Sequence, residues 1–342
     1  NMSAGNTLVI LVLLSVVGGV VTFKETKGFH YEKGIVNSLS NCPGRYCGRT
    51  RLVNGSWSAC GACERGLRRN NYSACEECSA APEFYDKLYL GFMGLLPLTF
   101  HLGFDVIVDI CYCLLMLNIM FTREVMALYV SAIVEVGVAA VVTLLVTEPY
   151  GSFNIRSCKI RKLADWYPLL HNPDPNYEGV LHCTQEAVYP LYSMVFVFYT
   201  LCLMVMLLVR PILSSKLLPG RGKAAIYSAL YFLPALIVTH AVGAGLIYYS
   251  FPYMVIILSI ISNAAHFAFQ LDQSIPGLLM ECVMEVRNLV ILLGHWGLHA
   301  YGILAITQLR EGVLHGSLCA LVPLPALFYI LTSRFTDPSN FS

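Results

Sequence analysis

Six of the chain's 13 cysteines crowd into one short polar segment: Cys42, Cys47, Cys60, Cys63, Cys75 and Cys78. The last four form two Cys-x2-Cys pairs, and two such pairs can hold a zinc ion between four thiolates. The same thiols form disulfides in an oxidising compartment. The chemistry of this segment therefore depends on its compartment, and a zinc site at Cys60, Cys63, Cys75 and Cys78 stays open as the alternative to disulfides.

Three further side chains could do chemistry from within strongly apolar segments: Glu135, His295 and His299. The two histidines stand four residues apart, so they share one face of a helix and could bind a metal with a third ligand. Alternatively, they hydrogen-bond to neighbouring helices. Glu135 is expected to face a polar interior, because an ionised carboxylate near the bilayer centre costs roughly 2.5–3.5 kcal/mol on insertion scales. The alternative is a buried pair with a histidine of another span.

No fingerprint of a known catalytic site accompanies these residues. The chain has no G-x-S-x-G, P-loop or Rossmann pattern, and its histidine pair is not part of H-E-x-x-H. We therefore expect no enzyme activity and no cofactor.

The elements that must position these residues are membrane helices. Of the 342 residues, 56% are hydrophobic and only 13% are charged, against about 25% charged in an ordinary soluble domain. A formal net charge of +1 gives no field that would attract nucleic acid. Several nearly charge-free runs reach the roughly 20 residues that cross a bilayer as a helix. The sequence therefore predicts an all-α polytopic membrane protein embedded in the lipid bilayer.

About seven transmembrane helices follow the cysteine-rich segment and form a membrane domain over residues 87–332. Their expected positions are about 87–107, 125–147, 188–209, 225–250, 252–270, 288–307 and 314–332. Residues 105–121 continue the first apolar run and could form an extra span. Residues 1–22 contain a short apolar run whose length favours a signal peptide or an uncleaved signal anchor.

Sequons and cysteines indicate which side of the membrane the N-terminal domain faces. Asn54 and Asn71 each begin an N-x-S sequon within the cysteine-rich domain, residues 42–84. Behind a signal-like segment, this combination favours a lumenal, glycosylated and disulfide-bonded domain. The pairing of its cysteines stays open, since six cysteines allow 15 arrangements.

The remaining loops follow from counting spans from the lumenal domain. The loop 148–187 returns to the lumen, where Cys158 and Cys183 can form a fourth disulfide. The basic loop 210–223 and the C-terminal tail 333–342 then face the cytosol.

Prolines and glycines within the apolar runs carry a structural prediction. Five prolines in or beside the expected spans predict kinks, because proline removes a backbone donor: Pro190, Pro234, Pro252, Pro323 and Pro325. Such kinks could shape a cavity, although irregular packing is the favoured explanation. Gly243 and Gly245 would permit the close approach of a neighbouring helix, a packing role.

The chain resembles the Jun N-terminal kinase-associated membrane protein family (JAMP) over about residues 42–339. Several unusual strings occur in the family's order: YCG at 46–48, the CxxC at 60–63, LLVTEPYG at 144–151, DWY at 165–167, HCTQEAVYPLY at 182–192, AVGAGLIYYSFPY at 241–253 and HWGLHAYGI at 295–303.

This resemblance implies a seven-span protein of the endoplasmic reticulum with a lumenal N-terminal domain and a cytosolic C-terminus. It also implies an adaptor that recruits proteasomes and membrane ubiquitin ligases of the reticulum's degradation pathway to misfolded proteins. The same resemblance implies association with the stress-activated Jun N-terminal kinase and control of how long that kinase stays active.

The chain departs from the family pattern in two places. The apolar leader before residue 22 is unexpected, and residues 105–123 are apolar where a short basic loop is expected. No kinase-docking motif stands out on the expected cytosolic side. The string KIRKL at 159–163 has basic residues followed by leucine, as a kinase-docking motif does, but it is expected in the lumen.

Two other functions remain as alternatives. A seven-span receptor with a cysteine-rich outer domain fits the layout, although no D-R-Y-like motif ends the third span and no N-P-x-x-Y ends the seventh. A membrane enzyme or lipid-handling protein would need Glu135 and the span histidines to meet in one polar cavity.

Overall fold

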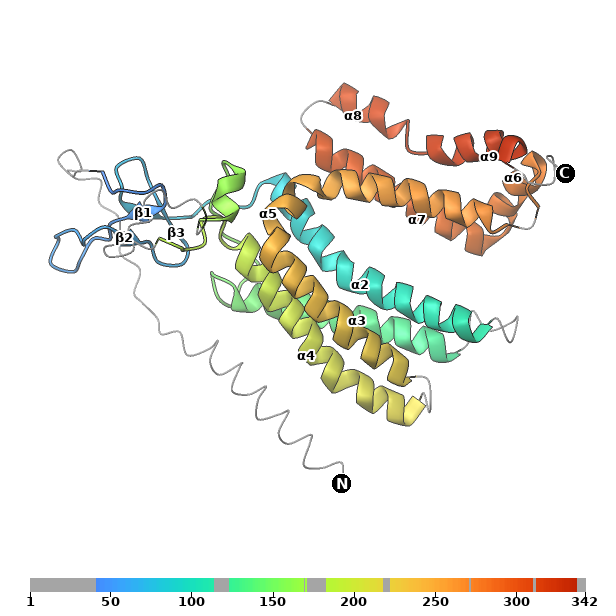
Figure 1. Cartoon of the computed structure of the whole chain (residues 1–342), viewed down its shortest axis with the longest axis horizontal. Helices are drawn as coiled ribbons and strands as arrows, with labels where there is room; N and C mark the ends of the chain where they lie inside the picture. Colours follow the sequence, from blue (N-terminus) through green and yellow to red (C-terminus); the bar gives the residue numbers. More distant parts are fainter. Residues whose placement is uncertain are drawn as a thin grey trace.

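The computed structural model describes residues 41–113, 123–168, 170, 183–217, 222–270, 272–309 and 312–336. Figure 1 shows a cysteine-rich region at one end and long helices that extend away from it. These described residues confirm a mostly helical membrane protein with a disulfide-rich N-terminal region. The expected signal segment 1–22 lies outside them.

Short strands order the cysteine-rich region. β1 Cys47–Gly48 pairs antiparallel with β2 Gly61–Ala62, and β3 Leu67–Arg69 pairs antiparallel with β4 Cys75–Glu77. Asn70 shapes the turn between β3 and β4, because its side-chain oxygen accepts from the N–H groups of Tyr72 at 2.9 Å and Ala74 at 3.0 Å. So few strand hydrogen bonds cannot hold a small domain alone, which leaves that task to disulfides.

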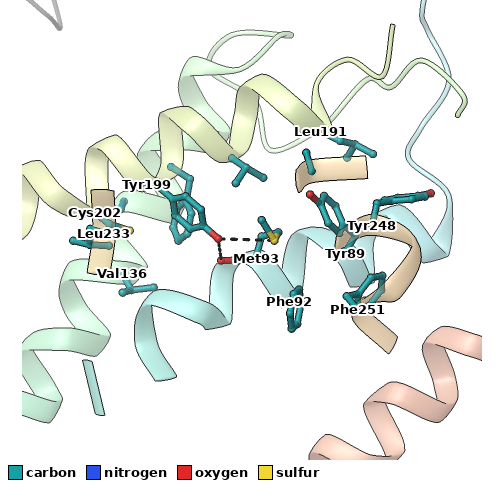
Figure 2. Packing of buried hydrophobic residues seen from close by; sticks show 14 of the residues in the cluster. Tyr89, Phe92, Met93, Val136, Leu191, Tyr199, Cys202, Leu233, Tyr248 and Phe251 are labelled. Carbon is teal, nitrogen blue, oxygen red and sulfur yellow. Dashed lines mark hydrogen bonds between the residues drawn. The ribbon is translucent and has the colours of Figure 1, made fainter. Parts of the chain in front are cut away.

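Four helical segments form the larger bundle: α2 Phe84–Cys113, α3 Arg123–Val146, α4 Leu191–Leu217 and the first half of α5 Gly222–Ala268. Its core contains aromatic and aliphatic side chains, among them Tyr89, Met93, Tyr199, Leu233 and Phe251 (Figure 2). The hydroxyl of Tyr199 donates to the carbonyl of Met93 at 3.1 Å. This bond satisfies a polar group that would be costly to bury alone, and it joins α4 to α2.

The helix α5 differs most from the expected elements. Two spans, 225–250 and 252–270, are expected, but one helix of 47 residues runs through both. If straight it would measure about 70 Å, more than twice the hydrocarbon thickness of about 30 Å. Figure 1 shows instead a sharp bend beside the cysteine-rich region, with both halves running away from it.

Pro252 accounts for this bend. Proline has no N–H, so the carbonyl four residues earlier, that of Tyr248, loses its helical partner. The hydroxyl of Tyr85, near the start of α2, donates to this carbonyl at 2.7 Å. The bend in α5 is therefore fixed to α2 at the end that faces the cysteine-rich region.

The second half of α5 belongs to a smaller helix group. It packs against α7 Val286–Thr307, beside α6 Ile275–Met284, α8 Gly312–Cys319 and α9 Leu324–Thr336 (Figure 1). A separate apolar core lies between these helices: Phe267, Leu278, Cys282, Leu292, Ala326 and Ile330.

Five segments of the described chain are long and apolar enough to cross a membrane: Ala127–Val146, Leu191–Lys216, Lys223–Ala268, Asn288–Thr307 and Gly312–Ser333. The expected count of seven is therefore not confirmed. The fourth and fifth expected spans share α5, and the seventh is divided between α8 and α9, where Pro323 precedes the second helix. Helix α9 continues to Thr336, so the tail expected from residue 333 begins within a helix.

The possible extra span over 105–121 lies only partly within the described residues. α2 continues through Cys113, so residues 105–113 extend the first expected span as helix. Residues 114–122 lie outside the described residues.

Candidate functional site

Four disulfides hold the cysteine-rich region together and join it to the loop 148–187: Cys42–Cys60, Cys47–Cys183, Cys63–Cys75 and Cys78–Cys158. The expected Cys158–Cys183 pair is wrong. Both cysteines instead reach back across α2 and α3, over 80 and 136 residues of sequence. The pattern arises because the loop folds onto the strands, which places Cys183 beside β1 and Cys158 beside the end of β4. We call residues 41–82, 157–168 and 183–187 the cysteine-rich module.

The alternative zinc site is not assembled in this arrangement. Its four cysteines are divided among three disulfides, so they do not face one another as four thiolates. Gly48 lies against one of these bonds, and a Cβ there would be 2.7 Å from the Sγ atoms of both Cys63 and Cys75. The glycine of the YCG string is therefore needed for this sulfur packing.

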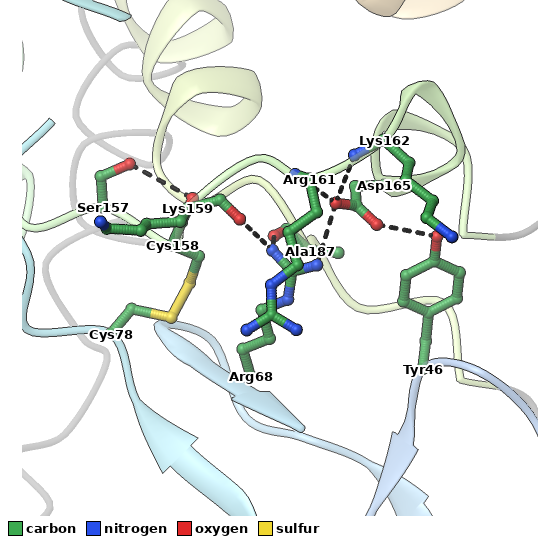
Figure 3. Close-up of polar contacts among 10 residues, drawn as sticks. All are labelled: Tyr46, Arg68, Cys78, Ser157, Cys158, Lys159, Arg161, Lys162, Asp165 and Ala187. Carbon is green, nitrogen blue, oxygen red and sulfur yellow. Dashed lines mark hydrogen bonds and ion pairs between the residues drawn. A yellow bond between two sulfur atoms is a disulfide. The ribbon is translucent and has the colours of Figure 1, made fainter. Parts of the chain in front are cut away.

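Asp165 joins the two parts of the module without a covalent bond (Figure 3). It lies on the short helix η1 Leu163–Trp166 and is 3% exposed. Its carboxylate accepts from the guanidinium of Arg68 at 2.9 Å, from the hydroxyl of Tyr46 at 3.1 Å and from the N–H of Arg161 at 2.8 Å. The N–H of Lys162 adds a fourth bond at 3.2 Å. The strands and the loop are thus held together through one buried carboxylate.

The electrostatics keep this carboxylate charged. Burial by itself would raise the pKa of Asp165, but the N–H of Arg161 and the guanidinium of Arg68 outweigh it, so the pKa lies below its ordinary value. Burial and the neighbouring negative charge of Asp165 raise the pKa of Tyr46 to about 12. Tyr46 therefore remains a neutral hydrogen-bond donor at neutral pH.

A cleft of about 580 Å³ opens between the strands and the loop. Its charged lining consists of five cations and one carboxylate: Arg45, Arg68, Arg69, Arg161, Lys162 and Asp165. The wall from the strands carries three of the cations, and the wall from the loop carries the other two. The cleft is therefore strongly basic although the whole chain is almost neutral.

Glu135 lies buried on α3 and pairs with Arg210 of α4, both side chains being 1% exposed. The Nε of Arg210 donates to the two carboxylate oxygens at 3.2 Å and 3.0 Å, and its Nη1 donates to the carbonyl of Ala225 on α5 at 3.2 Å. The hydroxyl of Ser131 donates to the same carboxylate. The partner of Glu135 is therefore an arginine, not a histidine. α4 continues to Leu217, which places Arg210 inside the bundle and not in the expected loop 210–223.

His295 and His299 connect α7 to the second half of α5. The Nδ1 atoms of these histidines lie 3.0 Å and 2.9 Å from the hydroxyl oxygens of Ser262 and Ser259. In the part of the chain that the structure describes, no three metal-ligating side chains gather as a metal site. The histidines therefore hydrogen-bond between helices, in a different helix group from Glu135.

Both sequon asparagines are exposed in the cysteine-rich module. Asn54 lies in a tight turn, and its side-chain oxygen accepts from the N–H and the hydroxyl of Ser56 at 3.1 Å and 2.7 Å. Asn71 lines the basic cleft. Both positions are accessible from solvent, as a glycan would require, and their glycosylation remains a prediction.

The contacts around Asp165 and the ion pair of Arg210 are the features that sequence reasoning missed. For Asp165 the sequence does contain an indication, because it is a carboxylate two residues after the basic string at 159–163. For Arg210 the indication in the sequence is weaker: it is the first charged residue after an uninterrupted apolar run.

Comparisons with known proteins identify the family of the chain. The family model described as "JNK1/MAPK8-associated membrane protein" matches residues 42–338. Proteins of that name from Homo sapiens and Mus musculus are each 43% identical over 307 residues, which is 87% of this chain and 94% of each relative. A Caenorhabditis elegans homologue is 31% identical over 313 residues, 86% of this chain and 93% of the relative. No solved structure matches the chain.

The matched region begins at Cys42, the first cysteine of the module, and continues beyond the end of α9. It therefore includes the disulfides, the basic cleft and the Glu135–Arg210 pair. The chain belongs to the JNK1/MAPK8-associated membrane protein family.

Proposed function

We propose that this chain is a non-enzymatic adaptor of the endoplasmic reticulum membrane. It would recruit proteasomes and membrane ubiquitin ligases to misfolded proteins and regulate the duration of Jun N-terminal kinase activity. The observation that carries the proposal is family membership over residues 42–338, since the relatives are named for their association with JNK1/MAPK8.

The disulfide pattern supports a lumenal cysteine-rich module. Disulfides persist in oxidising compartments, and Cys78–Cys158 requires both of its ends to lie on the same side of the membrane. α2 and α3 lie between these two cysteines, so two crossings would return the chain to the side on which it began. The module and the loop 148–187 therefore share the lumenal side in this proposal.

The path of the later helices supports a cytosolic C-terminus. In Figure 1 the bend of α5 lies beside the cysteine-rich region, and the end of α9 lies far from it. Each half of α5 would cross once, followed by α7 and then by α8 with α9. Together with α2, α3 and α4, this path supports seven crossings.

Glycosylation tests the topology. Endoglycosidase treatment of the wild-type protein should increase its gel mobility, and the double variant Asn54→Gln with Asn71→Gln should show no shift. Each single variant is the control, because it retains one acceptor and should show a smaller shift. A wild-type protein without glycans but with reduced cysteines at the module would contradict the lumenal placement.

Co-precipitation of the kinase tests the adaptor role. Full-length protein should capture JNK1 from stressed cells, and a chain that ends at Thr336 should lose the capture while its thermal stability stays unchanged. The Asn54→Gln variant is the matched control, because its change lies on the opposite side of the membrane. Undiminished capture by the truncated chain would contradict the tail as the contact.

Recruitment of the degradation machinery needs its own measurement. Precipitates should contain proteasome subunits in increased amounts when a misfolded membrane client is co-expressed. The same experiment with a folded version of that client is the control. Equal amounts of proteasome in the two precipitates would contradict the proposed role in degradation without affecting the proposed association with the kinase.

A further inference from the structure

We propose that the basic cleft of the cysteine-rich module binds a phosphate group, carried either by a lipid headgroup or by a soluble phosphate compound. The cleft lies between Arg45 on the side of the strands and Arg161 with Lys162 on the side of the loop. This inference concerns the module alone and does not depend on the adaptor role.

The cations of the cleft fall into two groups. Arg68 is committed to Asp165, and Arg69 donates to the carbonyl of Gly44. By contrast, Arg45, Arg161 and Lys162 are exposed and form no ion pair with any described residue. Arg45 also contacts the neutral hydroxyl of Tyr46 through a hydrogen bond, which leaves its charge without a counter-ion. These three side chains are therefore the positive charges that remain for a ligand.

The backbone beneath these three exposed cations is fixed. Arg45 stands two residues before Cys47, and the disulfide Cys47–Cys183 joins its wall to the opposite one. The N–H groups of Arg161 and Lys162 both donate to the buried carboxylate of Asp165. A ligand would thus meet cations whose main chain is already in place, which reduces the entropy lost on binding.

The size and lining of the cleft favour a compact anion. Its volume of about 580 Å³ falls within the range of small-molecule sites, about 300–1,000 Å³. Guanidinium groups match the oxygens of phosphate in paired hydrogen bonds, and a lysine adds a point charge. An acidic peptide would need an extended groove for its backbone, so we favour phosphate over a protein ligand.

The position of the cleft relates it to the membrane boundary. Trp166, directly after Asp165, packs on Tyr89 and Tyr248 at ring distances of 5.7 Å and 5.1 Å. Tryptophan and tyrosine rings gather where the bilayer meets water. A phosphate at headgroup level would therefore be within reach of Arg161 and Lys162.

The test measures binding to the full-length protein in detergent micelles. Dioctanoyl phosphatidic acid and inorganic phosphate are the two probes, and native mass spectrometry gives the Kd of each. The double variant Arg161→Gln with Lys162→Gln should weaken binding by about tenfold or more, since it removes two charge-assisted contacts. The double variant Arg51→Gln with Lys87→Gln is the control, because it removes the same charge outside the cleft.

Each outcome bears on the proposal, provided that disulfide mapping shows all four bonds intact in both variants. If phosphatidic acid binds and inorganic phosphate does not, the source of the phosphate group is a lipid. If both probes bind comparably, the result supports a soluble phosphate compound. Failure of both probes to bind overturns the proposal. Equal weakening by the control variant, or equally tight binding of a hexaglutamate peptide, also overturns it.

Discussion

Replacement of Arg210 by methionine should destabilise the helix bundle strongly. The change leaves Glu135 buried at 1% exposure and without its cationic partner. Removing one member of a buried pair costs about 3–5 kcal/mol, because the remaining charge stays buried without compensation. Arg210→Met also removes the bond to the carbonyl of Ala225. At about 2–4 °C per kcal/mol for a domain of this size, the melting temperature should fall by roughly 6–20 °C.

The free cysteines of the membrane helices provide the assay. Cys202 and Cys282 are buried and carry free thiols. A thiol-reactive fluorescent dye should label them only as the helices open, so its signal during heating in mild detergent reports the melting temperature. Cys202 lies in the same bundle as the ion pair and therefore reports on the perturbed region.

Two further variants isolate the effect of burial. Arg156→Met breaks the ion pair with Glu77, whose side chains are 46% and 63% exposed, and it should cost less than about 1 kcal/mol. The double variant Arg210→Met with Glu135→Leu removes both charges and should recover most of the lost stability. A melting temperature for Arg210→Met like that of Arg156→Met, or a double variant no better than the single one, would refute the reasoning.

Three other changes should have measurable effects. Gly245→Ala should cost about 1–3 kcal/mol of stability by overpacking, since its Cβ would lie 2.8 Å from the Cβ of Trp166. The control Gly243→Ala should leave the melting temperature unchanged in thermal melts, because no atom of another segment lies near that position. The folded-state pKa of Asp165 is lowered, so its stabilising effect is present above the ordinary pKa of 3.8 and is lost as the pH falls through the folded value. Protection of the module's amides against hydrogen exchange, corrected for the pH dependence of the intrinsic exchange rate, should therefore fall on acidification in the wild type and change less in Asp165→Asn. Cys47→Ser opens a link over 136 residues and should lower the free energy of unfolding by up to about 5 kcal/mol through loop-closure entropy. Thermal melts in detergent that show no loss of stability would contradict this prediction.

The membrane helices and the disulfide-rich region could be predicted because both depend on local composition. Apolar runs of bilayer length need no knowledge of tertiary contacts, and clustered cysteines beside sequons indicate an oxidising compartment. The pairing could not be predicted, because Cys47 and Cys78 take partners from a loop beyond two helices. A local cluster gives no information on such distant partners.

The ion pair and the continuous α5 illustrate a second limit. Hydropathy treats the first arginine after an apolar run as the end of a span, whereas Arg210 pairs with Glu135 and stays inside. Hydropathy also separates spans at Pro252, whereas the hydroxyl of Tyr85 replaces the lost helical bond. In both cases a single tertiary contact overrides the local rule.

The disulfide between Cys47 and Cys183 has a consequence for biosynthesis. Cys63 and Cys75 are separated by only 12 residues, but the partner of Cys47 is synthesised 136 residues later. At about 5–20 residues per second, translation takes roughly 7–27 s to supply it. On the proposed orientation, Cys183 enters the lumen only after α2 and α3 have been inserted. In the proposed compartment, the thiol of Cys47 would stay open to oxidoreductases during this interval. The Cys47–Cys183 bond could then close only after α2 and α3 had both crossed the membrane, so its formation would depend on the correct insertion of this helical hairpin.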